Sequence, residues 1–199
     1  MATFCTDAGH GGRDSGASWH NMLEKDLNLI YTTSLNTTLK KRGHKVYTTR
    51  EQDINVPSLS TRCRLVNVYQ KQNAPAFDAI ISVHCNVAAY IENGVYKAKS
   101  DRHGFYAIYS QESQKSTKLA ETIAQQCDAA SVQLNHGGML STVQLGRSLA
   151  WIHKTTPTAV LLELGFMTNP EELALLKSVD YRAKMVEALA QGIEKYLSI

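Results

Sequence analysis

Short apolar segments alternate with longer segments of helical periodicity along this chain of 199 residues, and this alternation limits the possible folds more than any other feature. The predicted strands are residues 3–6, 44–49, 78–84, 104–110, 149–153 and 158–164. The predicted helices are residues 24–42, 58–72, 113–131, 170–178 and 181–197. Strands and helices in alternation predict an α/β fold: a single domain with a mostly parallel, twisted sheet of about six strands and helices on both faces.

The first predicted helix and the third predicted strand have the clearest patterns. Residues 79–83 (AIISV) are almost continuously apolar, as expected of a strand covered on both faces of a parallel sheet. Gly43 is expected to end the first helix, and Ser58 or Ser60 to cap the second. Residues 86–103 and the region around residues 137–138 are predicted loops. The apolar residues of the first helix follow i, i+3, i+4 spacing: Leu27, Ile30, Tyr31, Leu35 and Leu39.

The composition excludes several classes of protein. The chain has 43% hydrophobic and 20% charged residues and a formal net charge of +3, which is ordinary for a soluble globular domain. Because no Lys/Arg block and no basic-aromatic interleaving occurs, no nucleic-acid partner is expected. No apolar run reaches membrane-spanning length, so no membrane insertion is expected. The mild positive charge favours approach to a polyanionic substrate such as a bacterial wall.

The N-terminus and the cysteines bear on location. Residues 1–5 (MATFC) enter a predicted core strand without a basic start and an apolar stretch, so no signal peptide is expected and the protein is expected to be made in the cytoplasm. The cysteines form no CxxC pair, so free thiols are expected, and neither a zinc knuckle nor a redox dithiol. They are Cys5, Cys63, Cys85 and Cys127.

Four residues of the types that bind metals or move protons lie at corresponding ends of the predicted elements. His10, His84 and Glu163 lie at or just past the C-terminal ends of predicted strands, and Glu24 begins the helix after the first strand. Ligands of open α/β sheets bind beyond the C-terminal ends of the strands, so the four side chains are expected at one edge. Two imidazoles and a carboxylate commonly bind a catalytic zinc that keeps its fourth position for water, and a further carboxylate can accept a proton from that water. The set predicts a metal-dependent hydrolase.

Local context supports each of the four residues, and each has a structural alternative. Glycines on both sides of His10 let the backbone bend around a ligand, and the alternative, a phosphate-binding loop, lacks a matching GxxxxGK[ST] or GxGxxG pattern. His84 ends the most hydrophobic strand, where a polar side chain needs a partner. Glu24 alone would complement a helix dipole.

Glu163 is a carboxylate inside an apolar run, where an unpaired charge costs several kcal/mol. Its structural alternative is a buried salt bridge to Arg50 or Arg62. Which of the two glutamates binds metal and which transfers protons stays open at this point.

Three further polar residues are secondary candidates. Asp7 and Asp14 flank the His10 loop and are expected to orient His10. Asn86, two residues past His84, is expected on the same side of its strand and is a candidate substrate-binding residue, with a cap or turn role as the alternative.

Six stretches, in this order, resemble the zinc-dependent N-acetylmuramoyl-L-alanine amidases of the Amidase_3 type, which occur in bacterial cell-wall enzymes and phage endolysins. They span nearly the whole chain: DAGHGGRDSGA (7–17), LEKDLNL (23–29), GHKVYTTR (43–50), SLSTRCRLVN (58–67), ISVHCN (81–86) and PTAVLLELGFMTNPEE (157–172).

The resemblance implies a role for each residue of the set. His10, Glu24 and His84 would be the ligands of one zinc ion, and Glu163 the catalytic acid/base. The implied substrate is peptidoglycan, at the amide between the lactyl group of N-acetylmuramic acid and the L-alanine of the stem peptide. Residues 1–199 are then expected to be a single zinc amidase catalytic domain.

The chain also departs from the family. Residues 150–153 (AWIH) stand where the family often has an aliphatic residue and an arginine, and residues 86–103 have little family character. Both stretches are expected to border the substrate groove. No wall-binding repeat and no autoinhibitory helical insert is recognisable.

Two other functions remain as alternatives. One is a zinc peptidase that cuts within the stem peptide, and the other is an inactive wall-binding module. The missing signal peptide favours an endolysin that acts in lysis, is released by a holin-type partner and then reaches the cell wall. The protein is also expected to be a monomer.

Overall fold

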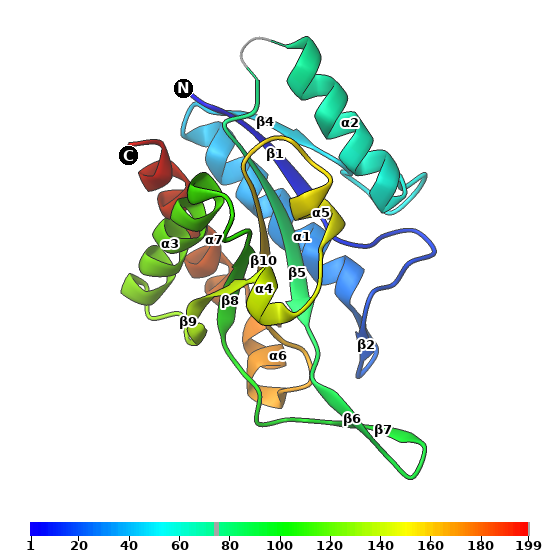
Figure 1. Ribbon diagram of the computed structural model, residues 1–199. Coiled ribbons are helices and arrows are strands. Elements are labelled where there is room, and N and C mark those ends of the chain that lie inside the picture. Colours follow the sequence, from blue (N-terminus) through cyan, green and yellow to red (C-terminus); the bar gives the residue numbers. More distant parts are fainter. Residues whose placement is uncertain (74–75, 199) are drawn as a thin grey trace.

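The computed structural model describes residues 1–73 and 76–198. Within them the central sheet has six strands in the order β4-β1-β5-β10-β8-β9 (Figure 1). These strands are β1 (Thr3–Ala8), β4 (Lys45–Thr48), β5 (Ala79–Asn86), β8 (Phe105–Tyr109), β9 (Leu134–Ser141) and β10 (Ala159–Phe166). β4, β1, β5 and β10 are parallel, whereas β8 pairs antiparallel with β10 and β9 follows the direction of β8. The predicted mostly parallel sheet of six strands is confirmed.

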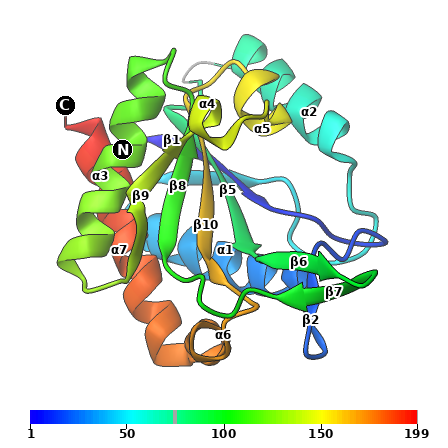
Figure 2. The same ribbon diagram turned by 60° about the horizontal axis from the view of Figure 1, so that its bottom comes forward.

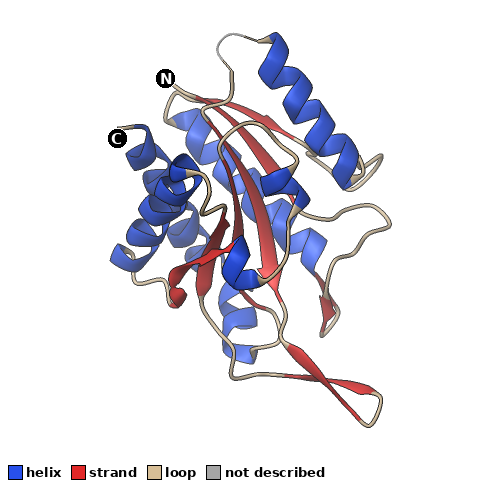
Figure 3. Ribbon diagram, in the orientation of Figure 1, coloured by secondary structure: helices blue, strands red, loops and turns tan. Residues whose placement is uncertain are grey.

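Seven helices, counted over the same residues, lie on both faces of the sheet or at its edge (Figures 1 and 3). They are α1 (Glu24–Lys41), α2 (Leu59–Gln72), α3 (Gln114–Ala129), α4 (Thr142–Leu145), α5 (Ala150–His153), α6 (Pro170–Lys177) and α7 (Val179–Leu197). α1, α3 and α7 cover one face, while α2, α4 and α5 lie over the other (Figure 2). The predicted single α/β domain with helices on both faces is confirmed.

Strand side chains alternate between two apolar clusters, one on each face of the sheet. The larger cluster lies under α1, α3 and α7, and takes Ile81 and Val83 of β5 and Leu162 of β10. The smaller cluster lies under α2 and α5, and takes Ile80 of β5 and Leu161 of β10. Because α2, α4 and α5 bury less apolar surface than the three long helices opposite, this second face has room for an open site.

The first helix follows its predicted pattern closely. Leu27, Tyr31, Leu35 and Leu39 are buried against the sheet, whereas Ile30, which the spacing included, is exposed. In α2 the cap is Ser58, whose hydroxyl oxygen accepts a hydrogen bond from the backbone N–H of Thr61.

One predicted strand is wrong and another was missed. Residues 149–153 form a short helical turn, α5, in which the N–H groups of Ile152 and His153 both bond to the carbonyl of Leu149. The sixth strand is instead β9, in the region predicted as a glycine-containing loop. His136 and the two glycines after it have positive φ, and the register with β8 shifts between Leu134 and Met139. This irregular stretch hides the strand from a period-two pattern.

The predicted loop at 86–103 contains a β-hairpin. β6 (Ala89–Glu92) and β7 (Val95–Ala98) pair antiparallel and extend away from the body of the molecule (Figures 1 and 2). The side chain of Tyr96 in this hairpin is 75% exposed. A second short pair, β2 (Ser18–Trp19) with β3 (Met22–Leu23), precedes α1.

All four cysteines are free and buried, as expected. Burial raises the pKa of each thiol, and for Cys127 to about 12. No helix within residues 1–73 and 76–198 combines the length and the apolar character needed to cross a membrane.

Candidate metal centre and catalytic groove

The alternation of side chains along the strands places three candidate residues on one face. Asp7 of β1 is in register with Ser82 of β5, and Glu163 of β10 is in register with His84 of β5. Ser82 and His84 are two residues apart and therefore point to the same side. Asp7, His84 and Glu163 consequently face the side of α2, α4 and α5, near the C-terminal ends of their strands.

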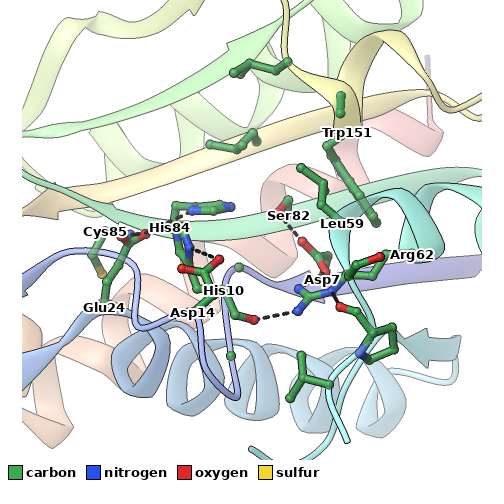
Figure 4. Close-up of a pocket in the computed structure, with 18 of the residues that line it drawn as sticks. Asp7, His10, Asp14, Glu24, Leu59, Arg62, Ser82, His84, Cys85 and Trp151 are labelled. Carbon is green, nitrogen blue, oxygen red and sulfur yellow. Dashed lines mark hydrogen bonds and ion pairs between the residues drawn. The ribbon is translucent and has the colours of Figure 1, made fainter.

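Glu24, the first residue of α1, lies between the two predicted histidine ligands (Figure 4). Its Oε1 is 3.0 Å from Nδ1 of His84, and its Oε2 is 3.3 Å from Nε2 of His10. One ligand atom from each residue lies within 4.8 Å of the others. Two imidazoles and one carboxylate this close together are a suitable ligand set for zinc.

Two glycines leave the space that this cluster needs. A Cβ atom on Gly9 would lie 2.2 Å from Cε1 of His84. A Cβ on Gly16 would lie 2.6 Å from both Oε2 of Glu24 and Cδ2 of His10, and Gly16 also has a φ of +61°. Any larger residue at either position would displace a predicted ligand, so the glycines around His10 serve the packing of the cluster.

His10 is held in an unusual conformation. Its φ is 62°, in the left-handed region that few residues other than glycine adopt. Its Nδ1 lies 2.9 Å from Oδ2 of Asp14, which confirms the predicted contact between Asp14 and His10. This contact leaves Nε2 facing Glu24, the orientation that a ligand histidine needs.

The cluster carries strong electrostatic coupling. Burial lowers the pKa of His10, but hydrogen bonds to Glu24 and Asp14 outweigh it and raise that pKa to about 9. Burial likewise opposes ionisation of Glu24, yet hydrogen bonds with His10 and His84 hold its pKa well below the ordinary value. The carboxylate is therefore ionised and ready to bind a cation.

Buried arginines fix the loop that carries His10. Arg62 donates to the Asp7 carboxylate at 2.9 Å and to the backbone carbonyl of His10 at 2.6 Å. Arg50 donates to the backbone carbonyls of Ala8 and Gly9 at 3.0 and 3.2 Å. The expected orienting role of Asp7 on the His10 ring is wrong, because the Asp7 carboxylate binds Arg62 and the hydroxyls of Ser82 and Thr49.

Glu163 stands beside the cluster without a polar partner for one of its oxygens. The residue is half-buried, and its Oε2 is shielded from solvent with no hydrogen bond to any described residue. Burial raises its pKa to about 7, partly offset by the nearby charges of His84 and Arg147. The alternative of a salt bridge to Arg50 or Arg62 is wrong, because both arginines are engaged at the end of β1.

A groove of about 790 Å³ connects these residues. The predicted ligands lie at one end, and the Asp7–Arg62 pair lies farther along, near Leu59 and Trp151 (Figure 4). Its walls are the segment before α2 and the segment from α4 to α5. The apolar lining comprises Val56, Pro57, Leu59, Ile108, Leu149, Ala150, Trp151 and Leu161. Both expected borders are met in part, since Ala150 and Trp151 of the stretch at 150–153 and Asn86 and Val87 of the stretch at 86–103 line the groove.

Asn86 also lines the groove, at the end of β5. Its side-chain amide donates to the hydroxyl of Tyr106, and its Oδ1 accepts from the N–H of Val87 at 2.8 Å. Tyr106 lies on β8 directly opposite Glu163. No sequence pattern points to Tyr106, to the groove residue Arg147 or to the orientation of Trp151, because their placement depends on how β8 pairs with β10 and on α4 and α5.

Comparison with known proteins agrees with this geometry. A protein family described as N-acetylmuramoyl-L-alanine amidase (Amidase_3) matches residues 5–195. The chain belongs to the Amidase_3 family. Members of this family are peptidoglycan hydrolases, and the predicted amidase function is confirmed at this level. The enzyme therefore hydrolyses the amide between the muramoyl lactyl group and L-alanine.

Individual relatives of this amidase cover its whole length. The uncharacterised Bacillus subtilis protein YqiI is 31% identical over 194 residues, which are 98% of this chain and 84% of that protein. The probable cell wall amidase LytH of Staphylococcus aureus is 29% identical over 98% of this chain, which spans only 58% of LytH. The N-acetylmuramoyl-L-alanine amidase AmiC2 of Nostoc punctiforme superposes with a TM-score of 0.80 at 26% identity, covering 100% of this chain and 98% of that structure.

Proposed function

We propose that His10, Glu24 and His84 hold one zinc ion and that Glu163 is the general acid/base of the amidase reaction. One observation carries this assignment. Glu163 has a carboxylate oxygen without a hydrogen-bond partner among the described residues, and it lies one strand away from a cluster of three side chains of the types that bind metals. Zinc bound there would polarise the amide carbonyl and make water a better nucleophile near neutral pH.

Glu163 is suited to move a proton in both directions. A pKa of about 7 lies near the working pH, where a group is able both to accept and to donate a proton. We propose that it accepts a proton from the attacking water and passes it to the nitrogen of L-alanine as the amide bond breaks. The Glu163 carboxyl forms no hydrogen bond or ion pair with the described residues, so it is not committed to a structural role.

The remaining groups of the centre position the substrate and the ligands. Asp14 holds His10 through Nδ1, and Arg62 holds the backbone of the same residue. Asn86 lines the groove and is proposed to contact substrate, with Tyr106 fixing the orientation of its amide. Action as a monomer, a holin-type release partner and a role in lysis stay predictions.

The assignment is tested by the products of peptidoglycan digestion. Purified peptidoglycan is digested with zinc-loaded and with chelator-treated protein, and the fragments are identified by mass spectrometry. Free stem peptides that begin with L-alanine, formed only with metal present, are the expected result. Fragments cut between amino acids would instead assign a peptidase, and binding of the wall without cleavage by zinc-loaded protein would assign a wall-binding module.

The metal ligands are tested separately from the reaction. His84→Ala is expected to reduce bound zinc from one ion per chain to a small fraction, since it removes one of three ligands. Metal content is measured by elemental analysis after dialysis. A variant that keeps stoichiometric zinc would remove His84 from the ligand set.

A further inference from the structure

Most charged groups in the groove are already engaged. Asp7 is paired with Arg62, and Glu24 lies between the two histidines. The two groove cations that form no ion pair or hydrogen bond with any described residue are Arg13 and Arg147, and both are exposed. A free guanidinium in a substrate groove can bind an anion, because it presents several N–H donors in a planar fork.

The backbone presenting Arg147 is well fixed even though its side chain is free. Ser141 and Gln144 form a reciprocal capping box at the start of α4. Gly146 then ends α4 in a left-handed conformation with a φ of 72°, directly before Arg147. After it, Trp151 is buried in the smaller apolar cluster. The backbone of Arg147 is therefore held at a defined point of the groove wall between two anchored turns, while its guanidinium stays free to meet a ligand.

Arg147 follows β9 and α4 at the β10-β8-β9 end of the sheet, which is the side that carries Glu163 and Tyr106. Its charge acts on Glu163 and on Tyr106, lowering the pKa of both groups against the dominant effect of burial. Arg13, by contrast, belongs to the loop of His10 on the metal side. Glu112 shares a neighbouring cavity with Arg147 but forms no ion pair with it within the described residues.

The chemistry of the reaction orients the substrate relative to these two sides. A general acid must reach the nitrogen that departs, so the L-alanine nitrogen lies beside Glu163. The stem peptide then extends from that point, with the next residue about 3.5 Å farther along. In peptidoglycan this second residue is a D-glutamyl group linked through its γ-carboxyl, which carries either a free α-carboxylate or an α-carboxamide.

We propose that Arg147 binds the free α-carboxylate of this second stem residue and makes the enzyme selective for the unamidated peptide. The inference rests on the proposed function, since it takes the direction of the peptide from the role of Glu163. Because Arg147 is exposed, the pair forms at a hydrated edge of the groove, and its selectivity comes from the planar two-point contact between guanidinium and carboxylate. Arg147 acts here as a specificity residue and takes no part in bond breaking.

The kinetic test uses two substrates that differ in one group. They are N-acetylmuramoyl pentapeptides with either D-glutamate or D-isoglutamine at the second position, and released peptide is measured by chromatography. Wild-type enzyme is expected to prefer the carboxylate in kcat/KM by about tenfold. Arg147→Gln is expected to lose this preference by slowing the carboxylate substrate alone, and Arg147→Lys to keep part of it. Arg13→Gln, the same charge change on the metal side, is the matched control and is expected to leave the ratio unchanged.

A binding measurement makes the proposal independent of turnover. The product tripeptides L-alanyl-γ-D-glutamyl-L-lysine, as acid and as α-amide, are titrated into wild-type and Arg147→Gln protein by calorimetry. Tighter binding of the acid by about tenfold, lost in the variant, is expected.

Equal binding of the two tripeptides by wild-type protein, or a variant that weakens both equally, would overturn the role of Arg147. Failure of the proposed function is a different result, because the wild type would then release no L-alanyl peptide from either pentapeptide.

Discussion

The two ends of the groove treat their carboxylates in opposite ways. At the end of β1, Asp7 receives hydrogen bonds from Arg62, Ser82 and Thr49, so both of its carboxylate oxygens are engaged. At the end of β10, Glu163 has an oxygen with no partner in the described structure. Both residues point to the same face near the C-terminal ends of parallel strands, so the difference comes from their neighbours.

This contrast separates groups that maintain the site from groups that react. A paired carboxylate such as Asp7 fixes a loop. Its removal would leave the buried Arg62 charge without a partner, which would lower the stability of the fold. An unpartnered carboxyl such as Glu163 is destabilising in the resting protein and is of use only where a substrate group arrives.

The largest expected effect is on turnover, through a change at Glu163. Glu163→Gln should lower kcat by about 10²–10⁴-fold, because it removes the proposed proton acceptor while keeping the shape of the side chain. Zinc content should stay at the wild-type value, and the variant should remain folded. A variant with near-wild-type turnover of peptidoglycan would remove Glu163 from the reaction.

The corresponding isosteric change at Asp7 should lower stability instead of turnover. Asp7→Asn leaves the buried Arg62 charge uncompensated, and the free energy of unfolding should fall by about 3–5 kcal/mol. Denaturant unfolding of Asp7→Asn and Glu163→Gln, measured in parallel, checks this. Equal stability of the two variants would mean that the contrast between Asp7 and Glu163 has no energetic basis.

The pH dependence of stability should sharpen the same contrast. In metal-free protein the folded pKa of Glu163, about 7, exceeds its ordinary value of 4.5, so the folded state binds more protons between these pH values. The raised pKa therefore stabilises the wild type relative to Glu163→Gln. This stabilisation is fully present below pH 4.5 and is lost as the pH rises to 7. The expected difference is about 3 kcal/mol between pH 4 and pH 8. A difference that does not change with pH would contradict the raised pKa.

The smallest expected effect concerns an exposed support of the metal centre. Asp14→Asn weakens the contact that orients His10 and should lower zinc affinity by about tenfold, with little change in unfolding free energy. Competition with a chromogenic chelator measures the affinity, and Lys118→Gln, a charge change on α3 away from the groove, is a suitable control. Unchanged affinity would mean that backbone contacts alone orient the ring.

The sequence was informative where the site depends on the sheet. Strand ends in a parallel sheet share one edge, so His10, Glu24, His84 and Glu163 could be expected together before any distance was known. Glycines around His10 pointed to a close approach, which the space at Gly9 and Gly16 explains.

The remainder depends on tertiary context that no local pattern carries. Residues 149–153 are apolar enough for a strand, but Trp151 and Ile152 are both buried on one turn of helix. The bulge at His136 conceals β9, and the groove wall that bears Arg147 follows β9 directly. No sequence pattern distinguishes Arg147 from any other exposed arginine that follows a glycine, so its position in the groove can be seen only in the assembled fold.

The burial of all four thiols has a practical consequence for following this enzyme at work. The chain presents no accessible thiol to a maleimide reagent, so Tyr96→Cys in the exposed β6–β7 hairpin would create a single attachment point. The hairpin begins shortly after Val87 on the groove rim. A fluorophore placed there would report arrival of a wall fragment without touching the residues that cut it.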